Sequence, residues 1–242
     1  MSAPEKLRVF CITSDNYLWA IQPFSYLFRT YWDTETEVIV GGYKMPPFDL
    51  PPMFRFHQIA ASNYPANRWS DGTIRFITAM PDQHFVLLLE DYWLCRKVDR
   101  RCVKYAHEFM KANPNVLRFD LTDDRLYTGG MKDVCAMEMY DVIETPYQSQ
   151  YQFSTQAGIW NKKLLLKLLR NGKTAWDTEI YTQPPASMRV VGTRQKPVRY
   201  ANAVHKGKLD PYQLRWISKA HLDRIRTLIP DKWLLTGKGE VV

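Results

Sequence analysis

Paired cysteines and zinc-ligand spacings are missing from this chain. Its 242 residues include four cysteines, none in a Cys-x-x-Cys pair, and the histidines are not spaced for a zinc site. These thiols are expected to be reduced, as in a cytoplasmic protein: Cys11, Cys95, Cys102 and Cys135. The N-terminus lacks a signal-peptide pattern, and no apolar run approaches the length that spans a bilayer. The sequence therefore predicts a cytoplasmic protein without a transmembrane segment.

Internal repeats, low-complexity tracts and an acidic charge balance are missing as well. The net charge is +8 and the pI is near 9.2, which favours an anionic partner such as a nucleotide, a nucleic acid or an acidic surface. The positive charges are spread along the chain and do not define one patch. A hydrophobic content of 45% indicates a globular protein with a sizeable core.

The most informative stretch is an apolar run that ends in two carboxylates. Residues 85–89 read as a strand covered on both faces, and Glu90 and Asp91 follow directly. In open α/β sheets, ligands bind beyond the carboxyl ends of such strands. Because the next residues are again apolar, the two carboxylates are costly to desolvate unless a cation or a hydrogen-bond donor meets them. The alternative is that they are ordinary polar residues that close a core strand.

Strand and helix patterns alternate along the first part of the chain. Strands are expected at 7–12, 37–42, 54–59 and 85–89. One helix is expected before Tyr31, and another after Ser70 or Asp71, either of which can act as its N-cap. This order predicts an α/β fold with a mostly parallel, doubly wound sheet and right-handed crossovers.

The second part of the chain alternates less regularly. Residues 98–110 are expected to form a helix, and strands are expected at 116–121, 189–192 and 198–204, with a possible strand at 138–144. Residues 154–160 are expected to start a helix that continues to Arg170, with an apolar stripe and an Asn171-Gly172 cap. Asp210-Pro211 is expected to start a basic helix that ends near residue 228.

Three motifs, in this order, resemble those of a group of phage and bacterial sugar transferases. That group has an LLEDY strand end, an S-x-Q-x-G-I-W helix start and a W-E/D-x-E box, which match residues 87–92, 154–160 and 176–179. The resemblance covers roughly residues 7–208 and implies a GT-A-type glycosyltransferase. It implies a catalytic domain over 1–208, with a nucleotide-sugar half at 1–95 and an acceptor half at 96–208. A basic helical extension over 209–242 would follow.

For the first half, the resemblance implies a nucleotide-sugar donor, with a UDP-sugar as our first choice. The turn from Thr13 to Asp15 would hold the base or ribose, and Arg68 would face phosphate. A plain N-capped helix is the alternative for residues 68–72. The predicted donor contacts are Thr13, Ser14, Asp15, Arg68, Ser70, Asp71, Glu90, Asp91, Tyr92 and Lys206.

A divalent cation, Mn²⁺ or Mg²⁺, is a further expectation, because it would offset the charge of the diphosphate leaving group. The chain departs from the Asp-x-Asp motif that is usual in GT-A metal sites. Its two carboxylates are adjacent and would point to opposite faces of an extended chain. We expect Asp91 to meet the metal or the donor ribose, and Glu90 to brace the turn. His205 would complete the metal shell or hold phosphate, or it is a solvated loop histidine.

The box at residues 176–179 is the candidate for the chemistry. An inverting transfer needs a base for the acceptor's hydroxyl proton, and a carboxylate between Trp and Ile is partly desolvated, which would raise its pKa. The sequence leaves open whether Asp177 or Glu179 is this base; both would share one face of an extended segment. A surface acidic turn is the alternative.

The positive charge favours DNA as the acceptor, with a 5-hydroxymethyl pyrimidine in phage DNA as the target, modified in the host cytoplasm. The base would leave the stack and be received by an aromatic side chain. Predicted acceptor contacts are Tyr151, Gln156, Gly158, Trp160 and Trp176, with residues 156–160 at a helix N-terminus. Core packing is the alternative for Trp160. The alternative functions are transfer to a cell-surface polysaccharide or lipid-linked saccharide, and non-catalytic nucleic-acid binding.

Overall fold

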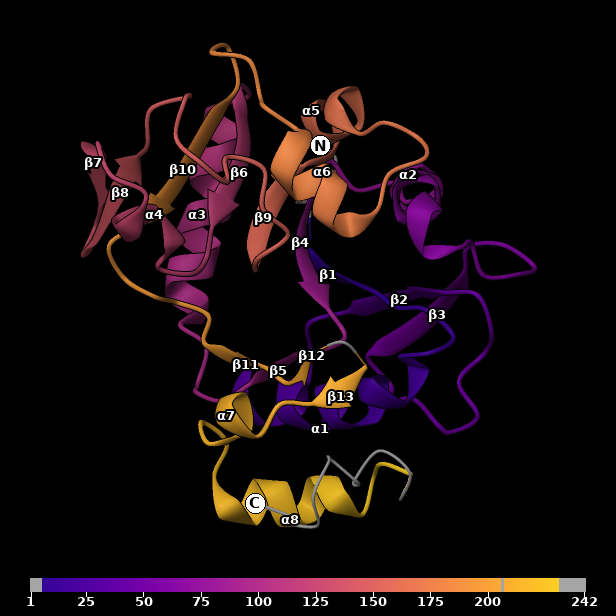
Figure 1. The fold of residues 1–242 in the computed structure, drawn as a ribbon. Coiled ribbons are helices and arrows are strands. Elements are labelled where there is room, and N and C mark those ends of the chain that lie inside the picture. The colour runs from indigo at the N-terminus through magenta and orange to yellow at the C-terminus, as the bar shows by residue number, and fades with distance from the viewer. Residues whose placement is uncertain (1–5, 206, 231–242) are drawn as a thin grey trace.

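The computed structural model describes residues 6–205 and 207–230. Its centre is a nine-stranded sheet (Figure 1). The strand order is β3-β2-β1-β4-β9-β6-β10-β8-β7. The strands are β1 (Arg8–Ile12), β2 (Val38–Gly42), β3 (Phe54–Gln58), β4 (His84–Leu89), β6 (Val116–Asp120), β7 (Lys132–Met137), β8 (Tyr140–Glu144), β9 (Gly158–Asn161) and β10 (Arg189–Thr193).

The sheet is mixed, with most of its strands pointing the same way. Strands β3, β2, β1 and β4 are parallel neighbours, as the sequence predicts, and β6 and β10 form a second parallel pair. Strand β9 runs antiparallel between β4 and β6, and the antiparallel hairpin β7–β8 closes one edge. The α/β alternation of the first hundred residues therefore builds half of the sheet.

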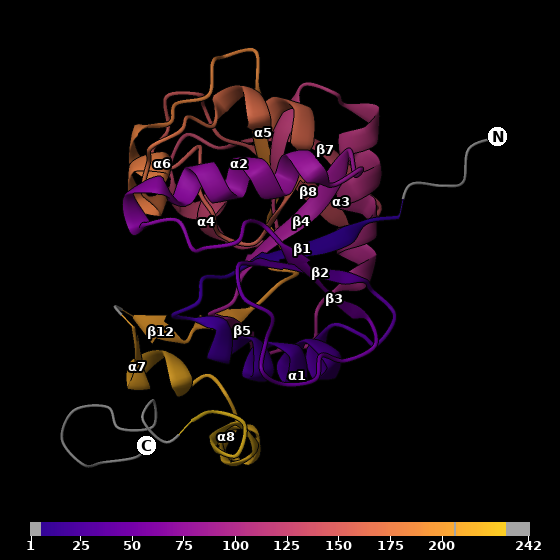
Figure 2. The ribbon, with the colours of Figure 1, turned by 90° about the vertical axis from the view of Figure 1, so that its right-hand side faces the viewer.

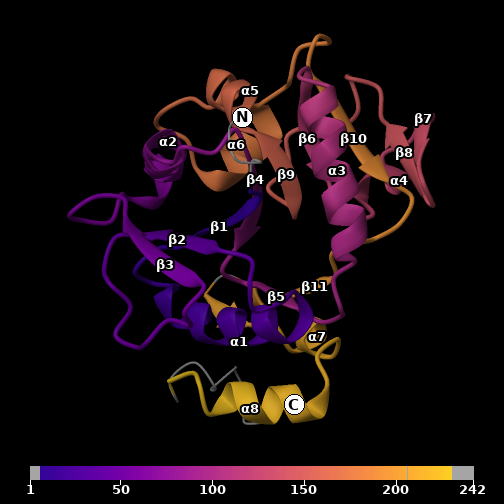
Figure 3. The same cartoon turned by 180° about the vertical axis from the view of Figure 1, so that it is seen from behind.

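Helices cover both faces of this sheet (Figure 3). On one face, α1 (Ile21–Tyr31) and α3 (Arg100–Ala112) pack on Val9 and Cys11 of β1. On the other, α2 (Trp69–Ala79) and α5 (Lys162–Leu168) pack on Phe10 and Ile12. A strand buried on both faces must be apolar at every position, which explains the continuous apolar runs of β1 and β4.

A smaller layer lies beside α1 (Figures 1 and 2). Strand β5 (Tyr92–Leu94) pairs with β11 (Tyr200–Asn202), and β12 (Val204–His205) pairs with β13 (Lys208–Leu209). Helix α8 (Lys219–Arg226) packs on α1 through a 2.7 Å hydrogen bond between Tyr26 Oη and His221 Nδ1. The remaining short helices are η1 (Leu18–Ala20), η2 (Ala66–Arg68), α4 (Asp124–Tyr127), α6 (Ala175–Tyr181) and α7 (Pro211–Leu214).

Three predicted helices need correction. Residues 158–161 form β9 rather than a helix, because Ile159 and Trp160 fill the space between β4 and β6. Helix α5 ends at Leu168, before the predicted Asn171-Gly172 cap. The predicted C-terminal helix is broken into α7 and α8, because Ile217 enters the core and Ser218 caps a new helix start. None of the helices in the described part of the chain has the length and apolar character to cross a membrane.

Candidate active site

Several strand ends meet at one edge of the sheet. In the parallel register, Ile12 at the end of β1 pairs with Leu89 at the end of β4. Strand β9 runs the opposite way, so its first residue, Gly158, lies opposite Leu87 of β4 and Asp120 of β6. The turn after β1, the pair after β4 and the segment before β9 therefore leave the sheet at the same edge, which is where ligands bind in folds of this class.

Glu90 and Asp91 form a turn at this edge, and both are half-buried. Burial, and then the charge of Asp91, raises the pKa of Glu90 well above its ordinary value; burial raises the pKa of Asp91 to about 7. The Oδ1 atom of Asp91 is buried and has no hydrogen-bond partner. Within the described residues, neither carboxylate forms an ion pair. Such a pair is costly to the fold unless a cation or a donor group reaches it.

The turn after β1 lies close to this acidic pair. Burial, and then the charges of Glu90 and Asp91, raises the pKa of Cys11 at the end of β1 and of Tyr17 beyond the turn. Within the turn, Thr13 is buried and Asp15 accepts a 3.2 Å hydrogen bond from the backbone N–H of Lys44. The residues on either side of the predicted base or ribose contacts are therefore close to the acidic pair.

Tyr92 connects the acidic pair with the box in the second half of the chain. Its ring is buried and stacks on Tyr200 at 4.2 Å. Burial raises its pKa, followed by the charges of Asp91 and Glu179, and a hydrogen bond with the Thr155 side chain opposes the shift. Glu179 Oε1 accepts hydrogen bonds from Thr155 N at 2.5 Å and Thr155 Oγ1 at 2.6 Å. Asp91 and Glu179 are therefore both close to Tyr92.

The two carboxylates of the 176–179 box have different surroundings. The segment is helical, as part of α6, so Asp177 and Glu179 do not share a face as they would in an extended chain. Asp177 forms a capping box with Thr174, and hydrogen bonds from this threonine lower its pKa. The prediction that partial desolvation raises the pKa of this residue is wrong, because its carboxylate is solvated and capped. Trp176 is 68% exposed.

Helix α2 is attached to the loop before this box. The prediction that Ser70 or Asp71 caps α2 is wrong, because both lie inside its first turn, where their side chains reach another segment. Ser70 Oγ accepts from Lys173 N at 2.9 Å, and Asp71 Oδ2 accepts from Gly172 N at 2.7 Å. Arg68 is exposed and pairs with Asp71 at 2.6 Å. Ser70 and Asp71 therefore hold the first turn of α2 and the loop before α6 together.

A buried charge cluster, which the sequence analysis misses, supports the segment between these parts. Arg118 and Asp120 on β6 and Arg125 on α4 are fully or almost fully buried. Asp120 lies 3.2 Å from Arg118 and 3.5 Å from Arg125. Arg118 Nη2 donates to Gln156 O, and Arg125 Nη2 donates to Tyr151 O, each at 3.0 Å. We call these three residues the buried arginine cluster; it fixes both ends of the segment 151–156.

The signal for this cluster is present in the sequence, as charges at 118 and 120 within an otherwise apolar strand. Gly158 makes room for it, because a Cβ there would lie 2.8 Å from Arg118 Nε. Gly158 and Trp160 are therefore not at a helix N-terminus: the glycine faces Arg118, and Trp160 is fully buried beside Phe153 at 5.0 Å. Core packing, the alternative for Trp160, is correct. Gln156 is half-buried at the edge.

The predicted metal ligands only partly converge. His205 is exposed on β12, in a segment connected to the acidic pair by a 2.8 Å hydrogen bond from Ala203 N to Asp91 O. Across residues 6–205 and 207–230, no three His, Cys, Asp or Glu side chains form a cluster that could hold a metal. Lys206, one of the predicted donor contacts, lies outside the described residues.

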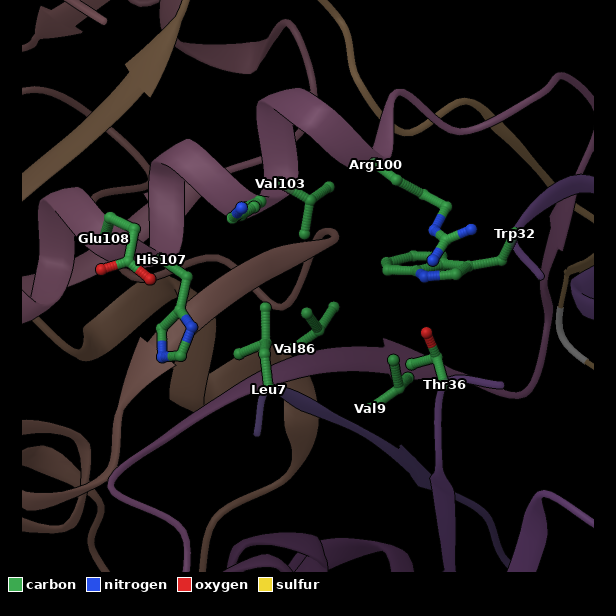
Figure 4. Close-up of a pocket in the computed structure, with 10 residues that line it drawn as sticks. Leu7, Val9, Trp32, Thr36, Val86, Arg100, Val103, His107 and Glu108 are labelled. Atoms are coloured by element: carbon green, nitrogen blue, oxygen red, sulfur yellow. The ribbon is translucent and has the colours of Figure 1, made fainter. Parts of the chain in front are cut away.

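A hollow of about 270 Å³ lies away from this edge, between α3 and the first residues of β1 and β4 (Figure 4). Leu7, Val9 and Val86 form its apolar floor, and Arg100 and Glu108 stand near its rim. It contains none of the predicted site residues. The candidate active site is therefore assigned to the opposite ends of these strands.

The comparison with known proteins identifies the fold class. No family model matches the sequence, and no curated protein matches it. The structure is similar to S. aureus TarS 1–349, with a TM-score of 0.52 and 13% identity over 92% of this chain and 65% of that one. The same protein in complex with UDP-GlcNAc gives 0.49, with 13% identity over 81% and 58%. The glycosyltransferase GlyE of Streptococcus pneumoniae gives 0.38, with 7% identity over 66% and 35%.

The chain thus spans less than two thirds of the length of TarS 1–349. At this identity the likeness concerns the fold, which is GT-A-like, as the sequence predicts.

Proposed function

We propose that this protein is a glycosyltransferase that moves a sugar from a nucleotide-sugar, with a UDP-sugar as first choice, to a hydroxyl acceptor. The observation that carries the proposal is the position of Asp91 and Glu179, both close to Tyr92 at the ligand-binding edge of a GT-A-like sheet. The choice of UDP comes from the resemblance, and the complex of TarS, a structure of similar fold, with UDP-GlcNAc agrees with it.

Glu179 is the proposed general base. Both hydrogen bonds from Thr155 go to its Oε1 atom, which orients the carboxylate. Its Oε2 atom receives no hydrogen bond from the described residues and is available to take the proton of the acceptor hydroxyl. Asp177 is part of the helix cap, so of the two residues that the sequence leaves open we propose Glu179 as the base.

The acidic pair suits a divalent cation that is shared with the donor. Asp91 Oδ1 is a buried oxygen without a partner, and Mg²⁺ is often held by one or two carboxylates together with substrate phosphates and water. Asp91 would bind such an ion, and Glu90 would add negative charge beside it. The ion would offset the charge of the diphosphate leaving group. Coordination by His205 stays a prediction.

The finer predictions, a hydroxymethylated pyrimidine in phage DNA and a location in the host cytoplasm, depend on the positive charge of the chain and on the resemblance. Exposed or half-buried arginines of the C-terminal helices, among them Arg224 and Arg226, supply part of this charge. No contact in the described residues links them to Glu179. A modified-DNA acceptor therefore stays a prediction, and the assay below includes it.

Glu179→Gln is expected to lower kcat for sugar transfer about 10²–10⁴-fold, because the variant cannot accept the hydroxyl proton. Its dissociation constant for the nucleotide-sugar should stay within about threefold of the wild-type value, because Asp91 is unchanged. The assay combines UDP-sugars and Mg²⁺ or Mn²⁺ with plain DNA, hydroxymethylated DNA and oligosaccharides, and detects products by mass; calorimetry measures donor binding.

Asp177→Asn is the matched control, since it removes a carboxylate from the same helix. We expect nearly full activity and a slightly lower melting temperature, because the capping box is weakened. An inactive Asp177→Asn protein together with an active Glu179→Gln protein would show that the base is misassigned. Failure to bind any nucleotide-sugar would refute the proposed function itself.

A further inference from the structure

We propose that a cavity beside Glu179 is the acceptor subsite and that it takes an uncharged saccharide chain. This inference rests on the proposed function and specifies its acceptor. The cavity has a volume of about 350 Å³ and lies between the segment 148–152 and the end of α6. Glu179 contributes to its wall, so a hydroxyl group bound in the cavity would lie next to the proposed base.

The lining is rich in amides and poor in charge. Four glutamines line the cavity: Gln148, Gln150, Gln152 and Gln183. An amide side chain offers both donors and acceptors, as sugar hydroxyls require. Glu179 is the one charged side chain of the lining, and no lysine or arginine belongs to it. A phosphate-bearing chain would therefore meet a carboxylate with no cation to neutralise it, which disfavours a polyanion in this cavity.

The loop beside the cavity holds an aromatic ring in an unusual conformation. Tyr151 has a φ of +54° and is 54% exposed. A non-glycine residue is uncommon in this region and persists where its surroundings enforce the conformation. Here the buried Arg125 binds the Tyr151 carbonyl at 3.0 Å, and buried Gln152 binds Thr145 Oγ1 at 2.9 Å. The fold thus holds Tyr151 rigidly at the cavity wall, where its ring can stack on a sugar.

Trp176, a second exposed aromatic residue, extends this surface along α6. Ile180 lines the cavity and is 54% exposed, and Trp176 lies one helical turn before it with 68% exposure. Exposed aromatic rings on the surface of a helix have no packing role, but they suit the apolar faces of sugar rings. With Tyr151 at the cavity and Trp176 one turn away, the surface fits several linked sugars better than a single one.

The test measures binding of defined chains by saturation-transfer NMR and titration. The probes are cellohexaose and chitohexaose as neutral chains, a hyaluronan hexasaccharide as an acidic chain, and a 12-nucleotide single-stranded DNA. We expect a neutral hexasaccharide to bind, and Tyr151→Asn to weaken its binding at least fivefold. Asparagine is chosen because it tolerates positive φ, so the variant loses the ring while the backbone is kept. Trp176→Ala should weaken binding of the same chain as well.

Tyr212→Ala is the control, because Tyr212 is 61% exposed and does not line the cavity. It belongs to α7, which lies well away from α6 (Figure 1). Its saccharide binding should equal that of the wild type, and all three variants should bind the nucleotide-sugar normally. The inference is overturned if no neutral chain binds. It is also overturned if the probe whose binding Tyr151→Asn weakens is DNA or hyaluronan. Tyr151-dependent saccharide binding in a protein that binds no nucleotide-sugar would refute the transferase proposal and leave the saccharide site standing.

Discussion

Asp91→Asn is expected to melt at a higher temperature than the wild-type protein at pH 8 and to lose nucleotide-sugar-dependent activity. The wild-type carboxylate is half-buried, lies beside Glu90, and has a buried oxygen without a hydrogen bond. Removing its charge should raise the free energy of unfolding by about 1 kcal/mol or more. For a chain of this size, each kcal/mol raises the melting temperature by roughly 2–4 °C. Under the proposed function, the same charge would bind the cation and the donor.

The pH dependence of this effect follows from the direction of the pKa shift. The pKa of Asp91 rises from 3.8 to about 7 on folding, so between these values the folded state binds more protons than the unfolded state. The free energy of unfolding of the wild-type protein therefore falls as the pH rises through this window. The advantage of Asp91→Asn should be small at pH 4.5 and largest at pH 8. Thermal melts without ligand over this range measure it.

Two further measurements make the result specific. Asp49→Asn removes an exposed carboxyl group and should melt like the wild type at every pH. UDP with Mg²⁺ should stabilise the wild-type protein but not Asp91→Asn, because binding to the folded state raises stability only where the ligand binds. A variant that is destabilised equally at pH 4.5 and pH 8 would contradict the view that Asp91 is held in an unfavourable charged state.

The sequence predicts the first half of the fold well, because its signals are local. The apolar run of β4 and the acidic pair after it identify both a buried strand and the edge where the site lies. The same reasoning fails at β9, whose four residues are a strand only because β4 and β6 lie on either side of them. In isolation their apolar spacing fits the start of a helix equally well, so neighbouring strands decide the outcome.

In the candidate site, too, local signals could be predicted from the sequence, whereas contacts between distant segments could not. The resemblance indicates the 176–179 box without choosing between Asp177 and Glu179. The hydrogen bonds of Glu179 come from Thr155, which is brought close by the antiparallel β9 and not by sequence proximity. Total charge is a poor guide to the acceptor, because it does not locate the charges: the cavity beside Glu179 has no cation in its lining. Two of the arginines counted in the net charge of +8, Arg118 and Arg125, are buried and bind carbonyls of the protein itself.

The buried arginine cluster leads to the second large prediction, which concerns stability. Asp120→Asn is expected to lower the free energy of unfolding by about 3–5 kcal/mol, because it leaves two buried guanidinium groups without their counter-ion. Burial already lowers the pKa of Arg125, as does the neighbouring charge of Arg118, and Asp120 opposes this shift. Urea denaturation measures the loss.

Asp133→Asn is the matched control, because Asp133 forms a 2.6 Å ion pair with Arg194 in which both partners are exposed. Exposed pairs contribute about 0–1 kcal/mol, so this variant should unfold almost as the wild type does. Asp120→Asn should also speed amide hydrogen exchange in the segment 151–156, because Arg118 and Arg125 bind the carbonyls at its two ends. Equal stability losses in the two variants would mean that the cluster is not held by its central carboxylate. If exchange in 151–156 stays slow although Asp120→Asn lowers the stability strongly, the buried arginine cluster is not what holds the segment that carries Tyr151 and Thr155.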